Sequence, residues 1–162
     1  MYENILTEID AGVGIITLNR ADRHNAFDDQ TIIELIDALC VMDENPEVRV
    51  VVLSSTGKSF SAGADLNWMK RAAAQGADEN LRDARNLAEM LRCIAQMTKP
   101  TVARVQGPAY GGGVGVVAAC DIAIATFDTQ FALTEVKLGI IPSAISPHVI
   151  AAIGERYSRR YM

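Results

Sequence analysis

The feature that most restricts how this chain can fold is a pattern of strand, small-residue loop and helix start that occurs twice. The first copy, VVVLSSTGKSFSAGADL, covers residues 50–66, and the second, TVARVQGPAYGGGVGVV, covers residues 101–117. A loop that leads into a helix leaves backbone N–H groups unpaired at the positive helix end, where negative charge is stabilised. Two such loops facing each other across a cleft would form an oxyanion hole made of main chain alone.

Around these two copies, the hydrophobic pattern alternates between strands and helices. The expected strands cover Ile5–Ile9, Val13–Leu18, Arg49–Ser54, Thr101–Val105, Ile122–Ala125 and Gln130–Leu133. The third of these is continuously apolar, which is typical of a strand buried on both faces. The expected helices are one capped by Asp28 or Asp29, one starting near Asp65, one capped by Asp78, one from Gly111 to about Cys120, and one after Pro142 that Pro147 and Gly154 break. The alternation predicts an α/β fold in a single domain over residues 1–162.

The composition excludes several other classes of protein. Hydrophobic residues make up 49% of the chain and charged residues 22%, a balance typical of a globular domain and not of a disordered or collagen-like chain. A net charge of −5 argues against nucleic acid and against an anionic membrane surface as partners. Three scattered cysteines, Cys40, Cys93 and Cys120, and only two histidines argue against a metal site. The most apolar stretch, Val114–Ala125, is too short to span a bilayer, so we expect a soluble, cytoplasmic protein.

Three nucleotide-binding or hydrolase motifs are incomplete in this sequence. Gly57-Lys58-Ser59 resembles the end of a phosphate-binding P-loop, but Val52 stands where that pattern needs a glycine. Ser59 and Ser61 each lack one glycine of the G-x-S-x-G nucleophile elbow. The run 111–115 never completes G-x-G-x-x-G. Nucleotide binding or a serine nucleophile therefore does not explain the two small-residue loops.

Blocks of sequence spread along the chain together resemble the crotonase superfamily of enoyl-CoA hydratases and isomerases. In chain order, these blocks are Leu18-Asn19-Arg20 with His24-Asn25-Ala26, Phe60–Leu66, Gly111–Gly113, Cys120-Asp121, and Glu135 with Leu138–Pro142. The resemblance covers the whole chain and implies a spiral of repeated ββα units. It also implies that the chain supplies roughly the N-terminal two thirds of a family member, without the C-terminal helical region. The tail Glu135–Met162 is most similar to bacterial hydratases of branched or carboxylated enoyl-CoA, such as methylglutaconyl-CoA hydratase.

The resemblance implies which residues form the site. The backbone N–H groups of Ala62 and Gly112 are expected to form the oxyanion hole, and Glu135 is expected to act as acid and base. Negative charge builds on the thioester oxygen when water adds to a conjugated enoyl thioester, and two N–H donors stabilise that charge. The residues expected to bind the substrate and its CoA part are Ala26, Gly63, Ala64, Asp65, Leu66, Pro142 and Ser143. A free N–H at Ser143 would help to hold the attacking water.

One position departs from the family pattern, because Gly115 stands where many hydratases carry a second glutamate. Either a single acid–base group has to suffice, or another group has to substitute for the second one. The resemblance implies a single carboxylate also in isomerases of the family and in the methylglutaconyl-type hydratases. The first hypothesis is therefore a hydratase. The second is a Δ3,Δ2-enoyl-CoA isomerase that uses the same three positions. The third is a catalytically silent fragment that binds acyl-CoA or assembles with partner subunits.

The resemblance also bears on cofactors and partners. No metal or redox cofactor is expected. Coenzyme A is expected only as part of the acyl-CoA thioester substrate. Neither nucleic acid nor a membrane is expected as a partner. With the full-length region present, a homotrimer or a dimer of trimers is expected. Fatty acid metabolism or branched-chain amino acid degradation is the expected setting.

Overall fold

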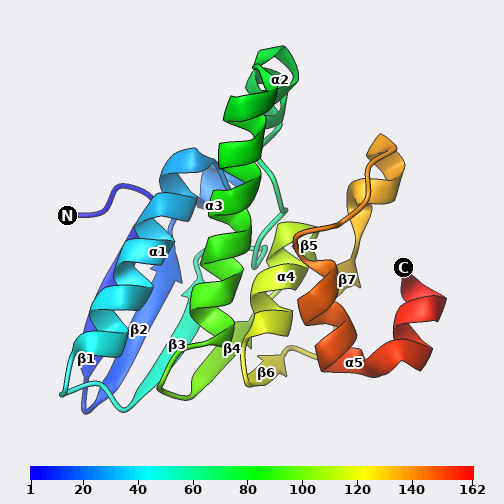
Figure 1. Cartoon of the computed structure of the whole chain (residues 1–162). Coiled ribbons are helices and arrows are strands. Elements are labelled where there is room, and N and C mark those ends of the chain that lie inside the picture. The colour runs from blue at the N-terminus through cyan, green and yellow to red at the C-terminus, as the bar shows by residue number, and fades with distance from the viewer.

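A five-stranded sheet forms the base of the structure, a computed structural model that describes residues 1–162 (Figure 1). Its strand order is β1–β2–β3–β4–β6, in which β1 and β2 form an antiparallel hairpin and all other neighbours are parallel. The strands are β1 (Ile5–Asp10), β2 (Val13–Leu18), β3 (Val50–Ser55), β4 (Thr101–Val105) and β6 (Ile122–Ala125). The predicted α/β class is confirmed, and the predicted strands agree with these bounds within one residue at each end.

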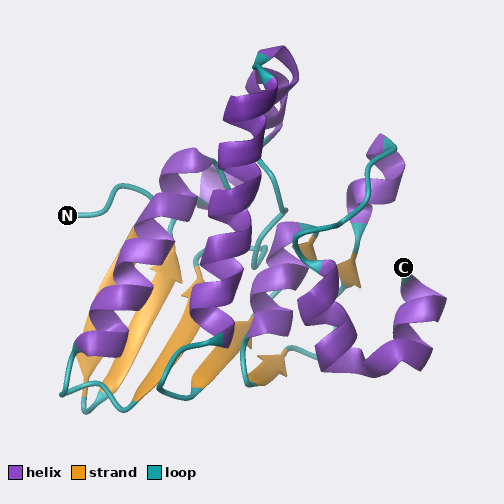
Figure 2. Cartoon of the chain, in the orientation of Figure 1, coloured by secondary structure: helices purple, strands orange, loops and turns teal.

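Helices follow the strands along the chain and gather on one side of the sheet (Figure 2). They are α1 (Asp29–Glu44), α2 (Leu66–Ala74), α3 (Ala77–Ala95), α4 (Gly112–Ala119) and α5 (Ser146–Tyr161). A smaller parallel pair joins β5 (Ala109–Tyr110) to β7 (Phe131–Ala132), so the predicted strand Gln130–Leu133 is shorter than expected. Two short 3-10 helices, η1 (Ala21–Arg23) and η2 (Thr134–Leu138), complete the chain.

Only one face of the central strands β2, β3 and β4 is buried, and the edge strands β1 and β6 are largely exposed. On the helix side, alternate residues such as Val51 and Leu53 of β3 are buried in one hydrophobic core with α1, α3 and α4. On the other side, Val50 and Val52 are only half-buried. The prediction that both faces of β3 are buried is therefore wrong, because the helices cover one face and leave the other open (Figure 2).

The helix ends show which capping predictions hold. Asp28, rather than Asp29, caps α1 by accepting a hydrogen bond from Thr31 N at 2.9 Å. Asp65 caps α2, as predicted, and accepts hydrogen bonds from the N–H groups of its first turn. Asp78 does not cap α3, because the helix already starts at Ala77 with Gly76 as its N-cap. An acid in the first turn still stabilises the positive helix end.

The last helix corrects a further prediction. Pro147 does not break α5, since it lies in the first turn, where a proline has no intrahelical N–H bond to lose. Gly154 does interrupt the helix, with φ +76° and ψ +161°. The chain therefore turns sharply at Gly154, and the two parts of α5 run in different directions (Figure 1).

The two small-residue loops of the repeated pattern pack directly against each other. Ser61 pairs with Ala109 in an isolated parallel bridge, and Tyr110 N donates to Ser61 O at 2.9 Å. Gly113 lies so close to this loop that an added Cβ would be 2.9 Å from both Cβ and O of Ser61. The helices α2 and α4 consequently begin side by side, as the facing-loop prediction requires.

Asp121 fixes the far end of α4. Its Oδ2 accepts hydrogen bonds from Thr101 N and Thr101 Oγ1, both at 2.8 Å, and Asp121 N donates to Thr101 Oγ1 at 2.9 Å. These hydrogen bonds from Thr101 lower the pKa of Asp121, although desolvation opposes them. The turn after α4 is thereby tied to the start of β4.

Apolar surface remains exposed beside α4. A wide hollow of about 1260 Å³ between α4, β7 and α5 is lined by 16 residues, of which 15 are hydrophobic. A continuous apolar surface of this kind is typical of a contact with other polypeptide. None of the helices has the length and apolarity needed to cross a lipid bilayer.

Replacing Gly113 by alanine should destabilise the fold by about 1–3 kcal/mol, because the new methyl group would overlap Ser61. Urea unfolding followed by circular dichroism measures this loss. Gly76→Ala is the control, since no atom lies within 4 Å of the Cβ that it adds. Equal, small effects of both substitutions would contradict the close loop contact.

The hydrogen-bonded carboxylate of Asp121 should make folding stability depend on pH. Its folded pKa is lowered, so its stabilisation is complete above the unfolded pKa of about 3.9 and is lost as the pH falls through the folded value. Asp121→Asn should cost about 1 kcal/mol at pH 7. The difference from wild type in the free energy of unfolding should shrink on acidification below about pH 4. A difference that stays constant down to strongly acidic pH would show that the carboxylate charge is not involved.

Candidate active site

A cavity of about 280 Å³ lies where the starts of α2 and α4 meet the segment 134–145. Its wall is mostly apolar, and Glu135 is its one titratable side chain. Phe27, Trp68 and Leu87 close it from the side of the core, and Ile140, Ile141 and other residues of the segment after η2 form the opposite wall. A small apolar cavity with a few polar groups is the usual form of a ligand site.

The structure brings most of the predicted site residues together. Seven of them line the cavity, namely Ala62, Ala64, Leu66, Gly112, Glu135, Pro142 and Ser143. Three do not line it: Ala26 and Gly63, which are buried, and Asp65, which caps α2. Ala26 O accepts a hydrogen bond from Arg20, and Gly63 O accepts one from Phe27 N at 2.7 Å. These three residues support the cavity wall from behind.

The expected N–H donor at Ala62 is already used inside the protein. Ala62 N donates to His24 O at 2.9 Å, so the prediction that this group is free does not hold. The N–H groups of Ala64 and Gly112 donate no hydrogen bond within the protein, and both residues line the cavity. The donor pair that the structure offers is therefore Ala64 and Gly112.

A two-residue ladder sets the direction of the Ala64 N–H. Phe27 N donates to Gly63 O at 2.7 Å, and Asp65 N donates to Phe27 O at 2.8 Å, which leaves Ala64 between the two bonds. In a parallel ladder, the residue between two such bonds points its own N–H and C=O to the opposite side. In an extended strand, the N–H groups of Ala62 and Ala64 would point in the same direction. Gly63 lies between them with φ +85°, and this left-handed conformation makes the two N–H groups point in different directions.

Glu135 reaches the same place from η2. An added Cβ at Gly111 would lie 3.0 Å from Glu135 Oε1, so the carboxylate touches the residue just before Gly112. Gly111 also has φ +48° and ψ −119°, a conformation that side chains rarely adopt. Glycine is thus required here both for the backbone conformation and for the approach of the carboxylate.

Two buried polar atoms of the cavity-lining side chains have no hydrogen-bond partner in the protein. They are Glu135 Oε2 and Trp68 Nε1. Glu135 forms no ion pair with Lys137, the nearest cation along the chain. Buried polar groups are nearly always paired, so these two atoms are suited to a bound ligand.

The position of the absent second glutamate is filled by an apolar side chain. An added Cβ at Gly115 would lie 2.5 Å from Ile145 Cγ2 and 3.3 Å from Leu91 Cδ1. Gly115 and Ile145 are both buried. The space next to the cavity is therefore packed with hydrocarbon, and it leaves no room for a second carboxylate at residue 115.

The prediction for Ser143 is also corrected. Its backbone N donates to Ile141 O at 2.9 Å and is not available to a water molecule. The residue is exposed at the cavity wall. The tight turn after Ile141 uses this N–H for itself, because the chain folds back at Pro142 to enter α5.

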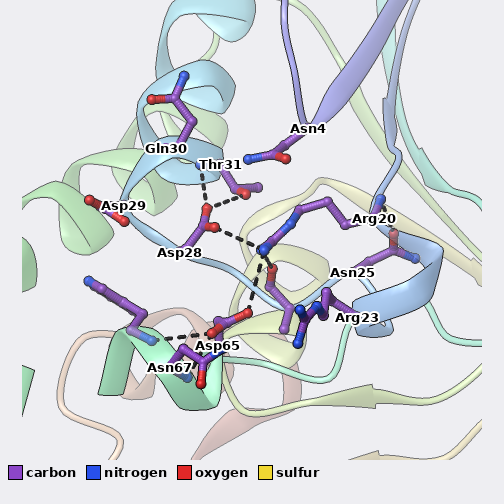
Figure 3. A network of polar contacts seen from close by, with 12 residues as sticks. Asn4, Arg20, Arg23, Asn25, Asp28, Asp29, Gln30, Thr31, Asp65 and Asn67 are labelled. Carbon is purple, nitrogen blue, oxygen red and sulfur yellow. Dashed lines mark hydrogen bonds and ion pairs between the residues drawn. The ribbon is translucent and has the colours of Figure 1, made fainter. Parts of the chain in front are cut away.

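Arg20, Asp28 and Asp65 form a charged cluster that does not line the cavity, and Figure 3 shows its contacts. Asp28 and Asp65, the N-caps of α1 and α2, both face Arg20. Burial by itself would raise the pKa of Asp65, but hydrogen bonds from Trp68 N and Asn67 N, together with the Arg20 charge, lower it. Sequence reasoning noted Arg20 without giving it a role. Two aspartates at neighbouring helix starts were the signal that a cation was needed between them.

Sequence reasoning also missed the aromatic and aliphatic parts of the wall. Phe27 packs so close to Gly112 that an added Cβ there would lie 3.2 Å from its ring. Ile145 reaches the cavity from the start of α5. No local pattern marks these residues, since their position depends on how distant segments pack.

Comparisons with known proteins identify the family. The family model described as Enoyl-CoA hydratase/isomerase matches residues 8–162. A curated relative from Thermus thermophilus is 36% identical over 155 residues, which cover 95% of this chain and 61% of the relative. A solved structure from Legionella pneumophila is 49% identical with a TM-score of 0.95, and covers 98% of this chain. An enoyl-CoA hydratase from Shewanella pealeana is 44% identical with a TM-score of 0.96, and covers 99%.

The names of these three proteins all contain the words enoyl-CoA hydratase. The chain spans about three fifths of the length of each, namely 61%, 61% and 60%. The matched part is their N-terminal portion, as the resemblance implied. By its sequence and by its crotonase fold, the chain belongs to the enoyl-CoA hydratase/isomerase family.

Proposed function

We propose that this protein adds water to a 2-enoyl-CoA thioester. One observation carries the proposal: the unpaired N–H groups of Ala64 and Gly112 and the carboxylate of Glu135 meet at one small apolar cavity. A thioester oxygen placed between the two N–H groups would be polarised by both. The same two donors would stabilise the enolate that forms when a nucleophile adds to the conjugated double bond.

The reaction can be written with Glu135 as its only acid–base group. The ionised carboxylate takes a proton from water as the water oxygen bonds to C3, and the electrons of the C2–C3 double bond move to the thioester oxygen. Ala64 N–H and Gly112 N–H hold the resulting enolate. Glu135 then returns the proton to C2, which restores the carbonyl and the ionised carboxylate. The protons balance, and the steps use no metal or redox cofactor; coenzyme A takes part only as the carrier of the acyl group.

The residues of the cavity wall also favour one kind of acyl group over another. No lysine, arginine or histidine lines the cavity, and its walls are largely aliphatic and aromatic. His148 lies in the first turn of α5 and does not line the cavity. Between the two acyl classes suggested by the tail, a branched aliphatic group therefore fits the residues of this chain better than a carboxylated one.

Removing the acid–base group should abolish hydration. Glu135→Gln keeps the size of the side chain but cannot exchange the proton, so kcat should fall by about 10²–10⁴-fold. Loss of the enoyl-thioester absorbance of crotonyl-CoA or 3-methylcrotonyl-CoA measures the rate. The exposed Glu155→Gln on α5 is the control and should leave the rate unchanged. Folded wild-type protein that consumes neither substrate would contradict the proposed function.

An ester in place of a single peptide bond tests the donor pair. Replacing Ala64 by lactic acid exchanges its N–H for an oxygen and changes nothing in the side chain, so kcat should fall by about 10²–10³-fold. The same exchange at Ala62 removes its hydrogen bond to His24 O and should cost about 1 kcal/mol of stability. It should leave kcat nearly unchanged. A larger loss of kcat at Ala62 than at Ala64 would restore the original donor assignment.

A Δ3,Δ2-enoyl-CoA isomerase is the second candidate function. The specific observation in its favour is Ile145, which fills the space of a second carboxylate beside Gly115. With one carboxylate, Glu135 would take a proton from C2 of a 3-enoyl thioester and return it to C4, through a dienolate that the same two N–H groups hold. Separate incubations of a 3-enoyl-CoA and of a 2-enoyl-CoA in ¹⁸O-labelled water distinguish the two functions. An isomerase yields the conjugated thioester without label, and a hydratase incorporates ¹⁸O at C3 of a 2-enoyl-CoA.

A further inference from the structure

The Arg20 side chain links the two segments that hold the Ala64 N–H. Its Nη1 donates to Ala26 O at 2.7 Å, and its Nη2 lies 3.0 Å from Asp28 Oδ2 and 3.4 Å from Asp65 Oδ2. Figure 3 shows the guanidinium between the two carboxylates. One planar cation thus contacts both segments at once, a geometry for which arginine is suited.

These contacts surround the ladder that directs Ala64. Ala26 and Asp28 flank Phe27, and Phe27 forms both hydrogen bonds of the bridge to the segment 63–65. Asp65 directly follows Ala64. Arg20 therefore contacts the two residues that flank Phe27 in the first segment of the ladder. In the second segment it contacts Asp65, the residue next to Ala64.

The aspartates have a second task, which fixes their orientation. Asp28 Oδ1 accepts from Thr31 N at 2.9 Å, and Asp65 Oδ1 accepts from Asn67 N at 2.8 Å. Each carboxylate thus caps a helix with one oxygen and faces Arg20 with the other. The exposed fractions of the Arg20, Asp28 and Asp65 side chains are 17%, 17% and 10%, so water screens these charges only partly.

We infer that Arg20 is a positioning residue of the reaction: it holds the starts of α1 and α2 together and so keeps the Ala64 N–H aimed at the thioester oxygen. This inference rests on the proposed function, because it takes the Ala64 and Gly112 pair as the oxyanion hole. Arg20 does not line the cavity, so it would act on the reaction through the backbone that it holds. Its loss should therefore lower the stabilisation of the enolate more than the binding of the substrate.

The chain offers a matched control. Arg71 of α2 also pairs with an aspartate of α1, since its Nη2 lies 2.9 Å from Asp29 Oδ1. The two side chains are exposed, at 54% and 57%, and neither contacts the ladder. Arg71→Met thus removes an ion pair between the same two helices without disturbing Ala64.

The test compares Arg20→Met and Arg71→Met by two measurements. With crotonyl-CoA, Arg20→Met should lower kcat by about 10²-fold, with KM changed far less, whereas Arg71→Met should change neither. The second measurement needs no turnover. Difference infrared spectroscopy of bound butanoyl-CoA, labelled with ¹³C at the thioester carbonyl, reports the hydrogen bonds to that carbonyl through its stretching frequency.

The infrared outcomes separate the inference from the proposed function. Wild type and Arg71→Met should shift the carbonyl stretch to lower frequency, and Arg20→Met should move it back towards the value of the free thioester. A full shift in folded Arg20→Met would overturn the role of Arg20 and leave the donor pair intact. If the wild type binds butanoyl-CoA and shows no shift, the proposed oxyanion hole fails and the role of Arg20 fails with it.

A milder variant covers the case in which Arg20→Met does not fold. Arg20→Lys keeps the charge but cannot contact Ala26 O and both carboxylates with one planar group. Its carbonyl frequency and its kcat should lie between those of wild type and the fully disrupted site. Circular dichroism shows whether each variant is folded. A folded Arg20→Lys protein with wild-type frequency and kcat would contradict the positioning role.

Discussion

The close contact between two small-residue loops is the constraint on which the site depends. An added Cβ at Gly113 would lie 2.9 Å from Ser61, and one at Gly63 would lie 2.9 Å from Tyr110 O. Because these glycines let the loops touch, α2 and α4 begin beside each other. The main chain at the two helix starts then faces one cavity, where the positive helix ends favour negative charge.

Main chain and side chains have separate tasks in this arrangement. The cavity itself contains backbone donors, hydrocarbon and the single carboxylate of Glu135. The cation Arg20 and its two aspartate partners lie behind the wall, where they orient the backbone. An apolar site strengthens the hydrogen bonds formed within it. With the other charges outside, Glu135 is the one titratable side chain that lines the cavity.

The sequence predicted the parts of the structure that local patterns control. Hydrophobic periodicity located the main strands and helices, and residues of the two small-residue loops line the candidate cavity. The prediction of a free N–H donor at Ala62 was wrong. The direction of this N–H depends on the left-handed backbone at Gly63 and on its distant acceptor, His24 O. The prediction of a free N–H at Ser143 was wrong for a local reason, since the tight turn after Ile141 uses it. Hydrogen-bond partners between distant segments follow from packing, which residue spacing does not encode.

The most direct test is a crystal structure of Glu135→Gln with crotonyl-CoA bound. The substitution should prevent turnover, so the intact thioester is observed in the site. The thioester oxygen is expected about 2.7–3.1 Å from both Ala64 N and Gly112 N, with the amide of residue 135 beside C2 and C3. A thioester oxygen out of reach of Ala64 N or of Gly112 N would contradict an oxyanion hole at these two residues.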